Sequence, residues 1–219
     1  MTLDDLVAKV VTGIQDPSFT EDDIIIWLNA GLLEATSLLC IPALQAQEII
    51  SLVPDGAGDF PKSVILAPTY SHDLFECRNT TASQPVAIRA SSQILRELYE
   101  GIANSNAFIE SCACEGRELW VMPYPQKEQE LIVRYYRHPS PMEDGEDIPE
   151  GIPVHLQNYV LVDFALKELW SLVEDGIDGK KVNTEFHTAR YQFGMQLLSS
   201  FYKDAPKKRP VIRRTARFF

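Results

Sequence analysis

The residues with the clearest potential for covalent chemistry are four histidines and four cysteines. They are His72, His138, His155, His187, Cys40, Cys77, Cys112 and Cys114. Nucleophilic catalysis needs a Ser or Cys beside a His that a third group orients. No histidine stands in such a local context, and the chain lacks a Gly-x-Ser-x-Gly elbow, a phosphate-binding Gly-rich loop and a Gly-x-Gly-x-x-Gly fingerprint. The sequence therefore predicts no catalytic residue and no cofactor.

Metal binding is the second chemistry that these residue types could support. Cys112 and Cys114 are the one close cysteine pair, and no second Cys or His pair stands at zinc-ligand spacing. On a strand their side chains would point the same way. Neither the acidic run Glu143–Asp147 nor the segment Glu174–Gly179 completes a calcium-loop pattern. We expect reduced, partly buried thiols and no metal site.

Length and composition are those of an ordinary globular protein. The chain has 219 residues, of which 45% are hydrophobic and 23% charged, so we expect one domain or one domain with a large insertion. No run of about 18 apolar residues predicts a membrane span. The segment Met1–Asp5 lacks a cationic region before an apolar stretch, so no signal peptide is expected. We expect assembly in the cytoplasm.

Charge is distributed unevenly along the chain. The net charge is −11, but the segment from Lys203 onward carries +6, which leaves −17 for residues 1–202. An acidic body repels the nucleic-acid backbone, whereas a basic tail attracts DNA or an acidic protein surface.

Helical periodicity is strongest at the two ends of the chain. Helices are predicted at residues 2–15, after the capping residue Thr20, at 154–174 and at 182–202, with a turn at 175–179. Asp23 completes a predicted capping box with Thr20. The last helix carries an apolar stripe of Phe186, Ala189, Phe193, Leu197 and Phe201.

The middle of the chain shows strand patterns and one short helix at 91–99. The predicted strands are Gln47–Val53, Asp73–Cys77, Pro85–Ile88, Phe108–Cys114, Glu118–Met122 and Glu130–Tyr136. The turn Glu115–Arg117 predicts a hairpin. We expect the strand Glu130–Tyr136 to continue this hairpin as a small antiparallel meander.

These elements predict an α+β fold in which helices and strands are segregated. We expect a mainly helical bundle, formed by two N-terminal helices and a C-terminal helical hairpin, with a small antiparallel β-rich insert and an extended C-terminal tail. The expected bounds are 1–44 and 150–202 for the helical body, 45–149 for the insert and 203–219 for the tail.

The basic tail alternates cations with apolar residues, which a simple solubilising tail does not contain. Such a segment is typical of chains that order on a partner. The candidate docking residues are Lys207, Lys208, Arg209, Val211, Ile212, Arg213, Arg214, Arg217, Phe218 and Phe219.

The order of these segments resembles the head-to-tail adaptor proteins of tailed bacteriophages, also called tail accessory or head-completion proteins. The resemblance rests on Gly116–Pro125, Glu130–Arg137, Ile148–Leu156, the helix Asn158–Glu174 and the segment Asn183–His187. It implies a ring, commonly of twelve copies, beneath the portal protein in the neck of the virion. The ring would extend the DNA channel and receive tail or nozzle proteins. Helices would form the ring body, and the C-terminal extension would dock onto the portal. The body is not expected to contact a membrane.

Two alternatives remain open. The chain is a phage-encoded DNA-binding accessory protein that places Arg209, Arg213, Arg214 and Arg217 on DNA phosphates, or it is a small hydrolase with an unrecognised site. Steep weakening of binding with salt would favour the first, because phosphate contacts release counterions. Loss of an activity on His or Cys substitution would favour the second.

Overall fold

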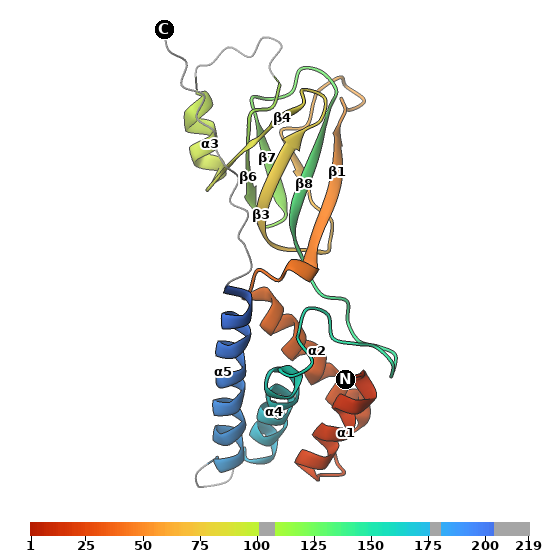
Figure 1. The fold of residues 1–219 in the computed structure, drawn as a ribbon. Helices are drawn as coiled ribbons and strands as arrows, with labels where there is room; N and C mark the ends of the chain where they lie inside the picture. The colour runs from red at the N-terminus through yellow and green to blue at the C-terminus, as the bar shows by residue number, and fades with distance from the viewer. Residues whose placement is uncertain (101–107, 176–180, 204–219) are drawn as a thin grey trace. The chain divides into compact units, whose positions relative to one another are not determined.

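The computed structural model describes residues 1–100, 108–175 and 181–203, which form two compact units (Figure 1). The helical unit comprises Met1–Leu44 and the segment that begins at His138, and the β unit comprises Gln45–Arg137. Most of the predicted turn at 175–179, and the predicted tail beyond Lys203, lie outside the described residues. No described helix is long and apolar enough to cross a membrane.

The two N-terminal helices begin at capping boxes. Helix α1 (Leu3–Ile14) follows Thr2, and α2 (Glu21–Ser37) follows Thr20. The Asp23 backbone N–H donates to Thr20 Oγ1 at 3.2 Å, and the Thr20 N–H donates to Asp23 Oδ2 at 2.9 Å. Each box satisfies backbone donors that a helix start would otherwise leave unpaired. The predicted start of α2 is confirmed.

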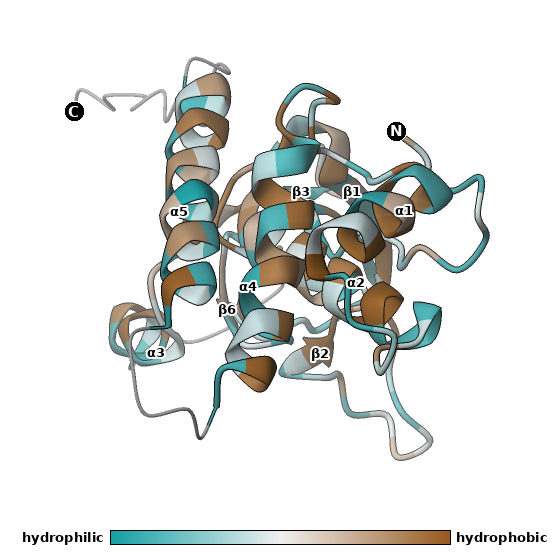
Figure 2. Ribbon diagram, turned by 90° about the horizontal axis from the view of Figure 1, so that it is seen from below, coloured by the Kyte–Doolittle hydropathy of each residue, from teal (hydrophilic) through white to brown (hydrophobic). Residues whose placement is uncertain are grey.

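The predicted helix 154–174 divides into two kinds of helix. The segment η2 (Asn158–Val162) is a π-helical turn, and α4 (Asp163–Val173) continues it as a regular α-helix. The last helix, α5 (Val182–Lys203), runs beside them. Within the helical unit, α4 lies between α2 and α5 (Figures 1 and 2).

Glycines let α2 approach α4 closely and α5 approach η2 closely. A Cβ atom on Gly31 of α2 would lie 2.8 Å from Phe164 Cδ1, and one on Gly194 of α5 would lie 2.5 Å from Tyr159 Cβ. Real Cβ atoms do not approach that closely, so both positions favour glycine for its lack of a side chain. The resulting core is continuous. Its buried members include Leu6, Val10, Ile24, Leu28, Leu32, Leu161, Leu169 and Leu198.

The acidic segment after the β unit packs against the helices. Met142 is buried, its N–H donates to Asn29 Oδ1 at 2.8 Å, and Asn29 Nδ2 donates to the Met142 carbonyl at 2.9 Å. The Leu3 N–H donates to the Asp147 carbonyl at 2.8 Å. These contacts tie the segment to α1 and α2, and it groups with the helical unit.

The β unit contains two four-stranded sheets and the helix α3 (Ser92–Tyr99). One sheet has the order β1-β8-β3-β4 and the other β2-β7-β6-β5. The strands are β1 (Gln45–Leu52), β2 (Ser63–Ile65), β3 (Tyr70–Asn79), β4 (Gln84–Pro85), β5 (Ala87–Arg89), β6 (Ser111–Glu115), β7 (Glu118–Met122) and β8 (Gln129–Arg137). A short 3-10 turn, η1 (Pro42–Leu44), precedes β1.

The predicted hairpin is confirmed, but the predicted meander is wrong. Strands β6 and β7 pair antiparallel around Gly116, whose φ of +59° suits a tight hairpin turn. Strand β8 does not extend this hairpin. It pairs with β1 and β3 in the other sheet, because the chain between β7 and β8 crosses from one sheet to the other.

The two sheets share one hydrophobic core. Its buried residues come from both sheets and include Ile50, Leu52, Cys77, Cys112, Leu119, Val121, Leu131 and Val133. A buried polar link also joins the sheets. The side-chain oxygen of Gln129 on β8 accepts from Asn79 Nδ2 on β3 at 2.6 Å and from the Ile109 N–H, next to β6, at 3.0 Å.

The expectation of a mainly helical bundle with a small β insert is therefore wrong. The class is α+β, but the β part is a sandwich of two four-stranded sheets with its own core. The physical reason is that one face of each sheet must be covered by apolar surface, and here the second sheet covers the first.

Replacing Gln129 by Ala is expected to destabilise the β unit by about 1–3 kcal/mol, because Asn79 Nδ2 and the Ile109 N–H then lose their buried acceptor. Urea unfolding followed by fluorescence measures the change. Gln126→Ala, at an exposed position of the connection between β7 and β8, is the matched control and should be near neutral. Equal unfolding midpoints for the two variants would contradict a structural role for the link.

Candidate interaction surfaces

A buried polar cluster of the helical unit surrounds Asp163. Its carboxylate is buried and lies 2.7 Å from His187 Nδ1 and 2.9 Å from Arg190 Nε. The guanidinium of Arg190 also lies over the rings of Tyr159 and Phe186, at 5.2 and 5.5 Å from their centroids. This arrangement neutralises a buried carboxylate and fixes α5 against the start of α4.

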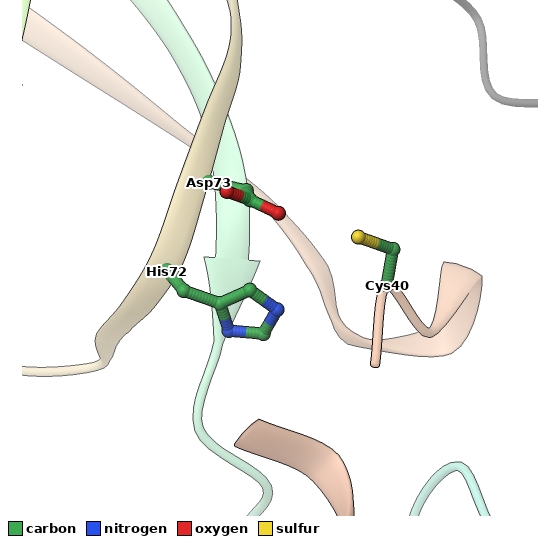
Figure 3. Close-up of side chains that lie close together, drawn as sticks. All are labelled: Cys40, His72 and Asp73. Carbon is green, nitrogen blue, oxygen red and sulfur yellow. The ribbon is translucent and has the colours of Figure 1, made fainter. Parts of the chain in front are cut away.

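His72 and His155 are packed against aromatic rings. His72 and Asp73 follow one another on β3, and Figure 3 shows them with Cys40, which belongs to the helical unit. In the β unit the His72 ring stacks on Tyr136 at 5.4 Å, and its Nδ1 lies 3.0 Å from Ser71 Oγ. His155 lies edge-on to Phe201 at 6.0 Å.

The cysteines of the β unit lie in its core. Cys112 and Cys114 share β6, and both contact side chains of β3, so they point the same way as predicted. A hydrogen bond with Cys77, followed by burial, raises the pKa of Cys112 well above its usual value. Burial also raises the pKa of Cys114. Since the thiolate is the nucleophile and the metal ligand, protonated core thiols are poorly suited to either role.

The acidic run Glu143–Asp147 is organised by its own backbone. The carboxylate of Asp147 accepts from the N–H groups of Glu143 and Asp144 at 2.8 and 2.9 Å, which lowers its pKa. Asp147 thus acts as a local turn cap, in a segment whose backbone is bound to α1.

Helix α5 exposes most of the apolar stripe that the sequence predicts. Phe186, Phe193 and Phe201 are each about half exposed, at 54, 50 and 54%, and Val182 and Leu197 are exposed beside them. The helix buries Tyr191, Gly194 and Leu198 instead. We call the exposed stripe, residues Val182, Phe186, Phe193, Leu197 and Phe201, the α5 face.

Helix α2 exposes a second apolar surface. Ile24, Leu28, Leu32 and Ala35 form its buried face. Ile26 and Leu33 lie on the opposite side and are 63 and 45% exposed, with the half-buried Ala30 between them. We call Ile26, Ala30 and Leu33 the α2 face.

The predicted docking residues of the tail, from Lys207 to Phe219, lie outside the described residues. The sequence predicts the tail as the docking surface. The α2 face and the α5 face were not predicted to be docking surfaces. The signal was present in the sequence, because α2 carries apolar residues on more than one side and α5 carries three phenylalanines on a single stripe.

Replacing Asp163 by Asn is expected to destabilise the helical unit by roughly 2–3 kcal/mol, because the charge-assisted bonds to His187 and Arg190 are lost. Chemical denaturation followed by circular dichroism at 222 nm measures the loss. Glu185→Gln, an exposed acid on α5, is the control and should change stability little. An equal effect of both substitutions would show that the Asp163 cluster does not hold α5 in place.

Comparison with known proteins agrees with the resemblance seen in the sequence. No curated protein matches the chain. The family model described as "SU10 adaptor protein" matches residues 1–214, which is nearly the whole chain. This match includes both structural units and most of the basic tail, and the family consists of phage head-to-tail adaptors. The chain therefore belongs to the SU10 adaptor protein family.

Proposed function

We propose that copies of this chain form a ring beneath the portal protein of a tailed phage, extend the DNA channel toward the tail and provide the site to which tail or nozzle proteins attach. Twelve is the copy number that the family resemblance implies. The observation that carries the proposal is the family match over residues 1–214. Membership in a structural adaptor family favours a virion component without catalysis.

Two features of the described residues support a ring. The helical unit exposes one apolar face on α2 and another on α5. Contiguous exposed apolar surface is typical of protein–protein contacts. A subunit of a closed ring uses two different surfaces, one for each neighbour.

The charge distribution supports a channel for DNA. Residues 1–202 carry a net charge of −17. A wall of the same sign as the phosphate backbone binds DNA weakly, so a genome can pass without being held.

The basic tail is proposed to dock onto the portal. Its cations would meet an acidic portal surface, while Val211, Ile212, Phe218 and Phe219 would enter apolar pockets. The tail pays its ordering entropy only when it binds.

Deletion of residues 204–219 is expected to abolish binding to the portal ring and to leave the helix content unchanged, because α5 ends at Lys203. Co-elution with purified portal on size exclusion measures binding, and far-UV circular dichroism measures helix content. Portal binding by the truncated chain at full strength would show that docking uses another surface.

The second candidate is DNA binding through the tail, which its net charge of +6 favours. Substituting Phe218 and Phe219 by Ala separates the two roles. We expect portal affinity to fall by roughly tenfold to a hundredfold, since losing two partly buried rings costs about 1.4–2.8 kcal/mol in total, at about 1.4 kcal/mol for each factor of ten. The matched variant replaces Arg213 and Arg214 by Ala.

The assay is titration at two salt concentrations against portal and against duplex DNA. If the tail binds DNA instead, the Arg variant loses duplex affinity, the affinity of the full chain for duplex falls steeply with salt, and the Phe variant still binds portal. That pattern contradicts the docking proposal.

A further inference from the structure

We infer that the α5 face of one copy packs against the α2 face of the next copy, so that these two surfaces form the contact that repeats around the ring. The inference rests on the proposed ring and goes beyond it by naming the surfaces and the order in which they pair.

The orientation of α5 keeps the phenylalanines of the α5 face exposed. Three half-exposed phenylalanines lie along one side of α5, and the side turned toward η2 and α4 is occupied by Tyr191, Gly194 and Leu198. The rotation of the helix is fixed, because Gly194 leaves no room between α5 and Tyr159 and because Asp163 binds His187 and Arg190. The phenylalanines therefore cannot turn inward without breaking these contacts.

The α2 face is fixed in the same way. Gly31 contacts Phe164 of α4, and Ile24, Leu28 and Leu32 fill the core, which leaves Ile26 and Leu33 pointing away from α4. Helix α4 lies between α2 and α5 (Figure 2), and each face lies on the side of its helix that is exposed, so the two faces are separate surfaces of the helical unit. A contact between them in successive copies is heterologous, and a heterologous contact can repeat to close a ring.

Charge favours the mixed pairing over pairing of like faces. Helix α2 carries Glu21, Asp22, Asp23 and Glu34 and no Lys or Arg, so an α2–α2 contact would bring carboxylates together. The α5 face is bordered by Arg190, whose side chain is 43% exposed and lies against Phe186. Guanidinium has donors beyond those that Asp163 uses, so it can also meet the acids beside the α2 face.

Pairing of two α5 faces is the remaining possibility between copies. Such a contact is two-fold symmetric and closes at a dimer, which leaves the α2 face of each copy in water. In the α5–α2 contact, other copies of the same chain cover both the α5 face and the α2 face of each copy. The second copy of the chain is therefore the occupant that the two faces fit best.

The test uses two single substitutions that each spoil one face, Leu33→Asp on α2 and Phe193→Asp on α5. Gln192→Asp, at an exposed position next to Phe193 but off the stripe, is the control and should assemble like the wild type. Analytical ultracentrifugation is run at a concentration at which the wild type assembles, with circular dichroism to check that each variant is folded. Each variant alone should stay monomeric, and an equal mixture should form a heterodimer that grows no further, because each copy then offers one intact face.

The other outcomes each overturn the inference. Dimers of Leu33→Asp alone would mean that α5 pairs with α5, and dimers of Phe193→Asp alone would mean that α2 pairs with α2. Normal assembly of both variants would place the contact elsewhere, and a monomeric mixture would mean that the α5 and α2 faces do not pair with each other; both results leave the proposed ring intact. A wild-type chain that stays monomeric even with portal ring added would remove the ring itself.

Discussion

The rotation of α5 about its own axis is the constraint on which the account of assembly depends. It is set by a buried carboxylate, Asp163, that holds His187 and Arg190, and by the close approach of Gly194 to Tyr159. These contacts cluster where the π-helical turn η2 passes into α4. Because they fix which side of α5 faces inward, they also fix which side carries exposed phenylalanines. The buried interaction of Asp163 with His187 and Arg190 thereby determines that the α5 face is exposed.

The β unit is organised around a different constraint. Its two sheets share one apolar core, and Gln129 joins them by accepting from Asn79 and from the Ile109 N–H. A buried amide is acceptable only when its donors and acceptors are satisfied, so this link favours one relative placement of the two sheets. Each unit thus has its own core and its own buried polar link. Such a division suits a subunit whose ring contacts and tail contacts are made by different parts.

Local features were readable from the sequence because their causes are local. The capping box of Thr20 and Asp23 follows from residues within one helical turn, and the hairpin at Gly116 follows from one strand pair. The span of α5 follows from the apolar periodicity of its own residues. The family resemblance rested on the order of such segments, and the family match bears it out.

Features that depend on distant partners were not readable. The pattern of β8 predicts a strand but not its neighbours, so placing it beside β7 was wrong. The three-residue strand β2 lies among Pro61, Lys62 and Pro68 and has too few residues to show alternation. Periodicity marks the stripe of α5 as apolar but does not distinguish a core from an interface. Asp163 shows no local sign that it is buried, because its partners His187 and Arg190 lie 24 and 27 residues further along the chain.

Electron microscopy of the full chain mixed with the portal ring of the same phage would show directly whether the proposed ring forms. We expect an additional ring layer below the portal, in which each copy contacts its neighbours through the helical unit. A bare portal beside free monomers would contradict it, and the basic tail would then be better explained as a DNA-binding segment.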